Sequence, residues 1–183
     1  MIRFIKRLFT LAVTFALLVS FGYCVVLPRV LPLKYRDAVE RYTDLYGLEK
    51  SLVNAVIFCE SHFEPEAVSS ADAVGLMQVT EETGWWAAAQ IGLAGEDIDL
   101  TDPDTNIRIG CWYLSWLMDK FDGVTETALA GYNAGHGNVE KWLADESISG
   151  DGITLEEIPY EETKGYVHKV QLIEKIYRYV YRL

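Results

Sequence analysis

The sequence predicts an all-α protein in which one apolar N-terminal helix precedes a single helical domain. Three observations lead to this prediction. Residues 8–27 form a run without a charged side chain, long enough to span a bilayer as a helix. In residues 37–183 the apolar side chains recur at steps of three and four, which is the helical period. No segment alternates convincingly between polar and apolar residues, as a half-buried strand would.

The apolar run 8–27 predicts a membrane anchor that comprises residues 1–27. Twenty helical residues are about 30 Å long, which matches the hydrocarbon core of a bilayer. Arg3, Lys6 and Arg7 precede the run, and positive flanks favour the cytoplasmic side. We therefore expect a single-pass protein of the cell membrane, with the rest of the chain on the extracytoplasmic side.

Two alternatives to a retained anchor concern the end of the same run. A cleaved signal peptide would have a shorter apolar stretch, closed by small residues before Pro28, and neither is present. Lipid attachment at Cys24 would call for a small residue before it, where Tyr23 stands. We expect the anchor to be retained, although cleavage stays open. Residues 28–36, with two prolines and three basic residues, are interpreted as a juxtamembrane linker.

The remaining residues, 37–183, are predicted to form one domain of seven helices. Gly47 follows the first of these helices and Gly123 the fourth, at positions where glycine commonly ends a helix. Residues 145–158, acidic and glycine-containing, are expected to form a surface loop. The expected helices comprise residues 37–46, 51–62, 80–91, 104–121, 125–134, 138–144 and 163–181.

Charge and cysteine content exclude several classes of function. The chain carries a net charge of −11, and its first 36 residues hold six basic side chains and no acid, so residues 37–183 carry −17. Such an acidic domain would be repelled by phosphate backbones, and we expect no nucleic-acid partner. The three histidines are scattered and no CxxC pair occurs, so we expect neither a metal nor a cofactor. Cys59 and Cys111 are expected to point inward, either as a disulfide or as two buried thiols.

Glu60 is the residue that does not suit its position. Leu52, Val53, Val56 and Ile57 form the apolar face of the helix 51–62, and Glu60 is the next step of that stripe. It also lies in the last turn, where the helix dipole disfavours a negative charge. Both effects favour the protonated acid and predict a raised pKa. The alternative is a glutamate that reaches solvent from the end of the helix, and amphipathicity alone does not separate the two.

Two glycine-containing turns carry amides and aromatic rings suited to sugar recognition. One is residues 75–78 (GLMQ), and the other is residues 131–135 (GYNAG). Oriented amides serve N-acetyl and hydroxyl groups, and flat rings pack on pyranose faces. Taken singly, each turn could equally be core filler or a helix cap. Of the five tryptophans, we expect at least three to belong to the core.

Four motifs in order resemble the catalytic domain of the soluble lytic transglycosylases. They are Glu60-Ser61, residues 75–78, residues 131–135, and Glu162-Thr163 followed by Tyr166-Val167. The resemblance extends from about residue 48 to 172, and its specificity comes from the set, since no single motif would suffice. It implies a lysozyme-like, mostly helical fold that cleaves the β-1,4 bond between N-acetylmuramic acid and N-acetylglucosamine in peptidoglycan.

The resemblance also implies roles for particular residues. Glu60 is expected to be the single catalytic acid/base, and the expected partners are peptidoglycan glycan strands and, through the N-terminal helix, the membrane. We expect the protein to act as a monomer. The implied substrate-binding or supporting residues are Ser61, Met77, Gln78, Tyr132, Asn133, Ala134 and Tyr166.

The number of carboxylates separates the candidate mechanisms. Most glycosidases use two carboxylates, and no second acid lies on an apolar stripe as Glu60 does. One acid favours a transglycosylase, in which the muramic acid 6-hydroxyl attacks and a 1,6-anhydro ring forms without water. The alternatives are a hydrolytic muramidase on the same fold, which would leave reducing ends, and a non-catalytic module that binds wall glycan, which would have no use for a buried acid.

Overall fold

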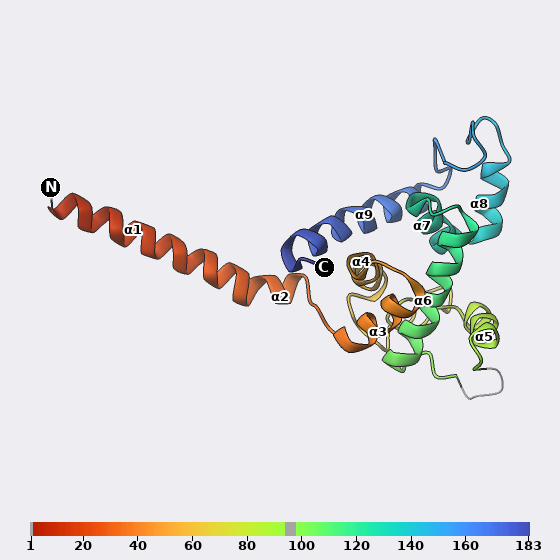
Figure 1. Ribbon diagram of the computed structural model, residues 1–183, viewed down its shortest axis with the longest axis horizontal. Coiled ribbons are helices and arrows are strands. Elements are labelled where there is room, and N and C mark those ends of the chain that lie inside the picture. Colours follow the sequence, from red (N-terminus) through yellow and green to blue (C-terminus); the bar gives the residue numbers. More distant parts are fainter. Residues whose placement is uncertain (1, 94–97) are drawn as a thin grey trace. The chain divides into compact units, whose positions relative to one another are not determined.

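The computed structural model describes residues 2–93 and 98–183. The chain folds as two compact units, one ending at Lys34 and the other formed by Tyr35–Leu183 (Figure 1). The described residues form helices and no strand, apart from two isolated bridges that join Val68, Val74 and Val79. The predicted all-α class is confirmed.

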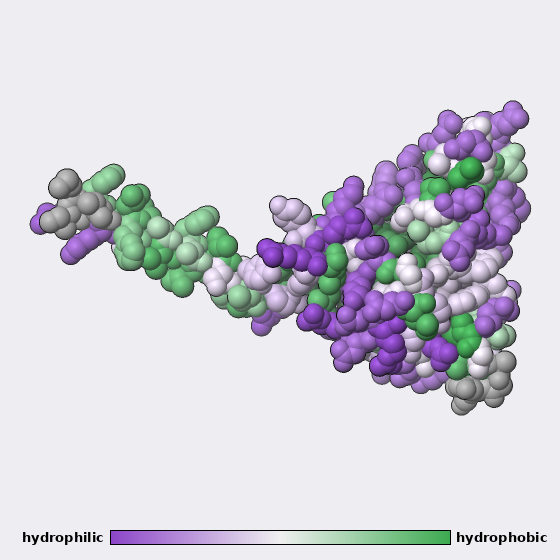
Figure 2. All heavy atoms as spheres, viewed as in Figure 1, coloured by the Kyte–Doolittle hydropathy of each residue, from purple (hydrophilic) through white to green (hydrophobic). Residues whose placement is uncertain are grey.

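The N-terminal unit is helical almost throughout. Helix α1 (Ile2–Phe21) continues through a π-helical turn, η1 (Gly22–Val26), into α2 (Leu27–Val30). Residues Lys6–Val30 are a candidate membrane span with a mean hydropathy of 2.2, and no part of its most apolar 18-residue window is buried within the protein. Apolar residues dominate the surface of α1 in Figure 2. This helix fits association with a membrane.

Helix α2 includes the first residues of the segment 28–36, which was interpreted as a juxtamembrane linker. The helix runs on to Val30 because Pro28 lies in the first turn of α2, where its missing N–H is not needed. The helix ends at Leu31 (φ −128°, ψ 77°), whose backbone is restricted by the following Pro32. The non-helical connection is therefore residues 31–35.

Seven helices are present among the described residues of the second unit, and their bounds match the predicted ones to within about two residues. Helix α8 begins at His136 rather than residue 138, and α9 at Glu161 rather than residue 163. Gly47 ends α3 in the left-handed conformation (φ 68°), and Thr80 caps α5 by accepting a hydrogen bond from the Thr83 N–H. The helices are α3 (Arg36–Tyr46), α4 (Lys50–Ser61), α5 (Glu81–Gln90), α6 (Pro103–Lys120), α7 (Thr125–Ala134), α8 (His136–Leu143) and α9 (Glu161–Tyr181).

Helix α4 lies at the centre of the second unit, packed against α9 and α3. Val53, Val56 and Ile57 are fully buried, so the helix is covered on more than one face. Side-chain hydrogen bonds reinforce this packing: Ser51 donates to Glu174 of α9 at 2.9 Å, and the same carboxylate pairs with Arg178 at 2.6 Å. The central position of α4 brings the residues at its C-terminal end into the interior.

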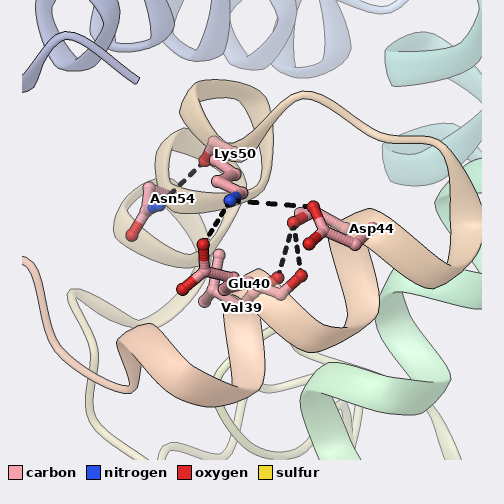
Figure 3. A network of polar contacts seen from close by, with 6 residues as sticks. Val39, Glu40, Asp44, Lys50 and Asn54 are labelled. Carbon is pink, nitrogen blue, oxygen red and sulfur yellow. Dashed lines mark hydrogen bonds and ion pairs between the residues drawn. The ribbon is translucent and has the colours of Figure 1, made fainter.

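The start of α4 is tied to α3 by an ion-pair cluster (Figure 3). The Lys50 ammonium lies between two carboxylates of α3, at 2.6 Å from Glu40 and 3.6 Å from Asp44. Asn54, one turn further along α4, donates to the Lys50 carbonyl. Both carboxylates are largely exposed, so the pairs contribute little stability.

Candidate active site

Glu60 lies in the last turn of α4, one turn after the fully buried Ile57. Removal of its carboxyl group from water raises its pKa from 4.5 to about 7. The predicted raised pKa is thereby confirmed, and its largest cause is burial. A carboxyl group with this pKa is protonated in a large share of molecules at neutral pH, which suits general acid catalysis.

Two side chains of α9 act in the opposite direction on the same carboxyl group. The Tyr166 hydroxyl and the Lys169 ammonium both favour ionised Glu60 and moderate the rise of its pKa. Tyr166 has no hydrogen-bond partner of standard geometry among the described residues, and burial next to Glu60 raises the pKa of its phenol. Glu60 therefore has a donor and a cation available when it loses its proton.

Tyr132 of α7 is a second phenol near Glu60. Burial raises the pKa of Tyr132, and the charge of Glu60 raises it further. Its hydroxyl donates to the Met77 carbonyl at 2.8 Å, and its ring centroid lies 5.4 Å from that of Tyr113. This bond joins the predicted turns 75–78 and 131–135, and with Tyr166 beside Glu60 the structure brings all four sequence motifs together.

Ser61 fixes the turn 75–78 to the end of α4. It is buried, and its hydroxyl contacts the Leu76 carbonyl at 2.8 Å and the Ile57 carbonyl at 3.2 Å. Gly75 has φ 84°, and a Cβ there would collide with Nδ2 of Asn106, so only glycine fits. Ser61 therefore holds the turn 75–78 against the end of α4, and only 7% of it is exposed.

Asn106 is a structural residue of the site that the sequence analysis missed. It lies in the first turns of α6 and is fully buried. Its amide oxygen accepts from the Met77 N–H at 2.8 Å, and its Nδ2 donates to the carbonyls of Val74 (2.9 Å) and Leu100 (2.8 Å). The signal in the sequence is a polar residue one turn before Gly110, on the face of α6 that carries Leu114 and Leu117.

The structure changes the interpretation of Met77. Its side chain was predicted to line a substrate groove, but it is fully buried. It packs so closely on α6 that a Cβ at Gly110 would lie 2.5 Å from its sulfur. An apolar, flexible side chain next to a glycine fills the interior, and the part of Met77 that reaches the site is its carbonyl, bound by Tyr132.

Some polar atoms of the remaining predicted site residues, Gln78 and Asn133, already form hydrogen bonds within the protein. Nε2 of Gln78 donates to the carbonyls of Ala67 (3.1 Å) and Gly75 (3.0 Å), which leaves its amide oxygen as the group for a ligand. The amide oxygen of Asn133 accepts from Thr163 of α9 at 2.8 Å, so its two N–H donors are the available atoms. Ala134 ends α7 and is half-buried.

No second carboxyl group of the described residues contributes to the pKa shift of Glu60. The five acidic residues that follow α4 or begin α5 all have exposed side chains, so none resembles Glu60 in its surroundings. They are Glu64, Glu66, Asp72, Glu81 and Glu82.

The tryptophans and cysteines depart in part from expectation. Of the five tryptophans, all of which the structure describes, Trp142 alone is buried, so the prediction that at least three are core is wrong. Cys59 and Cys111 are free thiols, the second of the two alternatives. Cys111 is buried and Cys59 partly exposed, and burial raises the pKa of the Cys59 thiol to about 11.

Comparisons with known proteins define the family of this chain. Residues 37–152 match the family model of the transglycosylase SLT domain. The chain belongs to this family. The solved complex of the 70-kDa soluble lytic transglycosylase with bulgecin A superimposes with a TM-score of 0.75 at 34% identity, and covers 84% of this chain and 25% of that one. The lysozyme-like fold implied by the resemblance is thereby confirmed.

Relatives of known name are much longer than this chain. It is 35% identical over 151 residues to the soluble lytic murein transglycosylase of Escherichia coli K12, matching 81% of this chain and 23% of the relative. Membrane-bound lytic murein transglycosylase C of Serratia proteamaculans is 32% identical over 167 residues, matching 79% of this chain and 47% of the relative. The chain thus spans about a quarter to a half of their lengths.

One solved relative carries a substitution at a glutamate. The lytic transglycosylase Slt of Pseudomonas aeruginosa was solved as an inactive mutant in which a glutamate is replaced by glutamine. It superimposes with a TM-score of 0.72 at 32% identity, and covers 83% of this chain and 25% of that one.

Proposed function

We propose that this protein is a peptidoglycan lytic transglycosylase, with Glu60 as its only catalytic acid and base. The observation that carries the proposal is the isolation of Glu60: a buried carboxyl group with a pKa of about 7, coupled to no other carboxyl group in the described structure. A two-carboxylate glycosidase requires a second acid within about 5–10 Å. The names of the relatives and the inactive glutamine mutant support the same function.

In the first step Glu60 acts as an acid. Its proton passes to the glycosidic oxygen between N-acetylmuramic acid and N-acetylglucosamine, and the bond from the muramic acid C1 to that oxygen breaks. The substrate's own N-acetyl oxygen stabilises the positive charge that develops at C1. Glu60 is left as a carboxylate, which the Tyr166 hydroxyl and the Lys169 ammonium favour.

In the second step the same group acts as a base. The Glu60 carboxylate accepts the proton of the muramic acid 6-hydroxyl while that oxygen forms a bond to C1. A 1,6-anhydro ring results, no water is consumed, and Glu60 is again protonated. A pKa of about 7 suits both steps, because the group must give and take a proton at similar pH.

We further propose that the protein is anchored by one membrane span, with residues 31–183 on the extracytoplasmic side. The basic residues before the candidate span Lys6–Val30 support this orientation. Peptidoglycan, the proposed substrate, lies outside the cytoplasm, which agrees with this orientation. Protease treatment of spheroplasts, followed by detection of a C-terminal tag, tests the orientation: digestion of the tagged domain is expected, and its full protection would exclude this topology.

Product analysis tests the activity. The full chain in detergent is incubated with purified peptidoglycan, and the masses of the released muropeptides are measured by mass spectrometry. Products that end in 1,6-anhydro-muramic acid are lighter than the hydrolytic ones by one water and are expected. Reducing ends would assign a muramidase on the same fold, and binding without release would indicate a glycan-binding module.

A further inference from the structure

A continuous set of aromatic side chains extends from Tyr132 across three further helices. The members of this aromatic array come from α5, α6, α7 and α8, and each ring centroid lies 4.9–6.1 Å from at least one other. The array comprises Tyr132, Tyr113, Trp86, Trp112, Trp116 and His136.

Tyr113 is the link between the candidate active site and the outer rings. It is buried, with its ring 5.4 Å from Tyr132 and 6.0 Å from Trp116, to which it is nearly parallel. Trp86 then meets Trp112 at 5.0 Å and Trp116 at 4.9 Å, edge to face in both cases. These contacts hold the outer indoles in fixed orientations, so they offer a prearranged surface.

The outer rings of the array are only partly covered by the protein. Trp86 is 36% exposed, and Trp112, Trp116 and His136 are half-buried. No indole N–H of Trp86, Trp112 or Trp116 donates a hydrogen bond to another described residue, so three donors remain beside the apolar faces. At the far end, the Lys120 ammonium lies 5.2 Å from the Trp116 ring and pairs with Glu140 at 2.5 Å.

We propose that Trp86, Trp112 and Trp116 form a saccharide-binding surface that holds sugar units of the glycan strand away from the cleaved bond. Flat apolar faces with N–H donors at their edges match a pyranose ring, which presents C–H groups on its faces and hydroxyl oxygens around its rim. Continuity with Tyr132 supports a polymeric occupant, because a strand held at Glu60 extends beyond it. The proposal rests on the proposed function.

Trp85 provides a matched control for Trp86. The two residues are adjacent on α5, and Trp85 is even more exposed, at 47%. Its indole N–H, however, contacts Glu81 at 3.3 Å, and its ring lines a separate cavity of about 370 Å³ with Val68 and Leu100. The same substitution at these two positions therefore removes the same side chain from inside and outside the aromatic array.

The first experiment measures binding without turnover. Full-length Glu60→Gln in detergent is titrated with chitohexaose, a β-1,4-linked hexamer of N-acetylglucosamine, by calorimetry. We expect Trp86→Leu or Trp116→Leu in this background to weaken binding about 3- to 10-fold, and Trp85→Leu to change it less than 2-fold. Trp86→Phe, which keeps a flat face, should recover part of the affinity, and thermal melting confirms that each variant is folded.

The second experiment uses the enzyme with Glu60 intact and measures turnover of peptidoglycan strands. Removal of remote sugar contacts should raise KM about 3- to 10-fold and leave kcat nearly unchanged. Equal effects of Trp85→Leu and Trp86→Leu in both experiments would overturn the proposal. So would displacement of the hexamer by free stem peptides, which would assign the surface to the peptide. Failure of the proposed function would give a different result. Sugar binding would still depend on Trp86, but no 1,6-anhydro product would form.

Discussion

Two carboxyl groups of this chain lie in opposite surroundings. Glu60, at the end of α4, has its carboxyl group largely withdrawn from water, and its pKa is raised to about 7. Asp151, in the loop after α8, is exposed and accepts hydrogen bonds from the backbone N–H groups of Ile153 and Thr154 and the Thr154 hydroxyl, which hold its pKa far below its usual value. A carboxylate surrounded by donors stays ionised, whereas a buried one with few donors retains its proton.

The difference separates a reactive group from a structural one. Asp151 has no tendency to give or take a proton near neutral pH, and its hydrogen bonds shape the loop. Glu60 is unfavourable as an anion, and this is the property that proton transfer needs. The comparison can be tested at both carboxyl groups and at the polar residues that hold their surroundings.

The largest expected effect is loss of activity on replacing Glu60. Glu60→Gln keeps the size of the side chain but can neither give nor accept the proton. General acid–base catalysis contributes about 10²- to 10⁴-fold, so release of anhydromuropeptides should fall at least about 100- to 1000-fold. Glu64→Gln, an exposed neighbour just past the same helix, should be nearly silent. Retained turnover in Glu60→Gln would mean that the wrong carboxylate has been named.

The second prediction concerns the support of the turn 75–78. Asn106→Ala removes three hydrogen bonds and leaves the Met77 N–H and the Leu100 carbonyl without these partners, while the Val74 carbonyl keeps the Val79 N–H; the loss should cost about 2–4 kcal/mol of unfolding free energy. Asn138→Ala removes one bond, to the Ala134 carbonyl, from a half-buried side chain and should cost about 1 kcal/mol or less. Chemical denaturation of both variants compares them. Equal losses would show that Asn106 does not hold the turn.

The fold and the buried acid could be predicted from the sequence because both depend on local patterns. Helical periodicity located α3 to α9, and the apolar stripe that ends in Glu60 predicted its raised pKa. The roles of Met77 and Asn106 could not be predicted, since they depend on which side chains meet across helices distant in sequence. The exposure of the tryptophans could not be predicted for the same reason: burial of Trp86 depends on the rings that α6 presents to it.

The third prediction is a pH dependence that distinguishes Glu60 from an ordinary carboxylate. Because the protonated form starts the reaction, kcat/KM should be level below pH 7 and fall about tenfold per unit above it. Lys169→Met removes a cation that lowers the pKa of Glu60, so this limb should move to higher pH by a fraction of a unit. Lys175→Met, on the same helix but lining a different cavity, serves as the control. A shift toward lower pH in Lys169→Met would contradict this electrostatic account.

The same raised pKa predicts the direction of a stability change. The folded protein holds the Glu60 proton up to about pH 7 and the unfolded chain only to about 4.5, so unfolding free energy falls as pH rises between these values. Glu60→Gln avoids this loss and should be more stable above pH 7, by up to about 3 kcal/mol. Below pH 4.5 the two proteins should differ little. Melting curves across this range measure the effect, and a difference that grew toward acid pH would have the wrong sign.

The smallest effect is expected at Asp151, and it should have the opposite pH dependence. Its folded pKa is depressed, so its stabilising contribution is present above the unfolded value of 3.8 and is lost as pH falls below it. Asp151→Asn retains one acceptor oxygen for the N–H groups of Ile153 and Thr154, and water can reach the loop, so Tm at pH 7 should fall by no more than about 3 °C. Asp151→Ala, which removes both oxygens, should fall further, with activity on peptidoglycan unchanged in both variants. A loss of turnover in Asp151→Asn would mean that the loop after α8 takes part in the site, and the contrast between a structural and a reactive carboxylate would then fail.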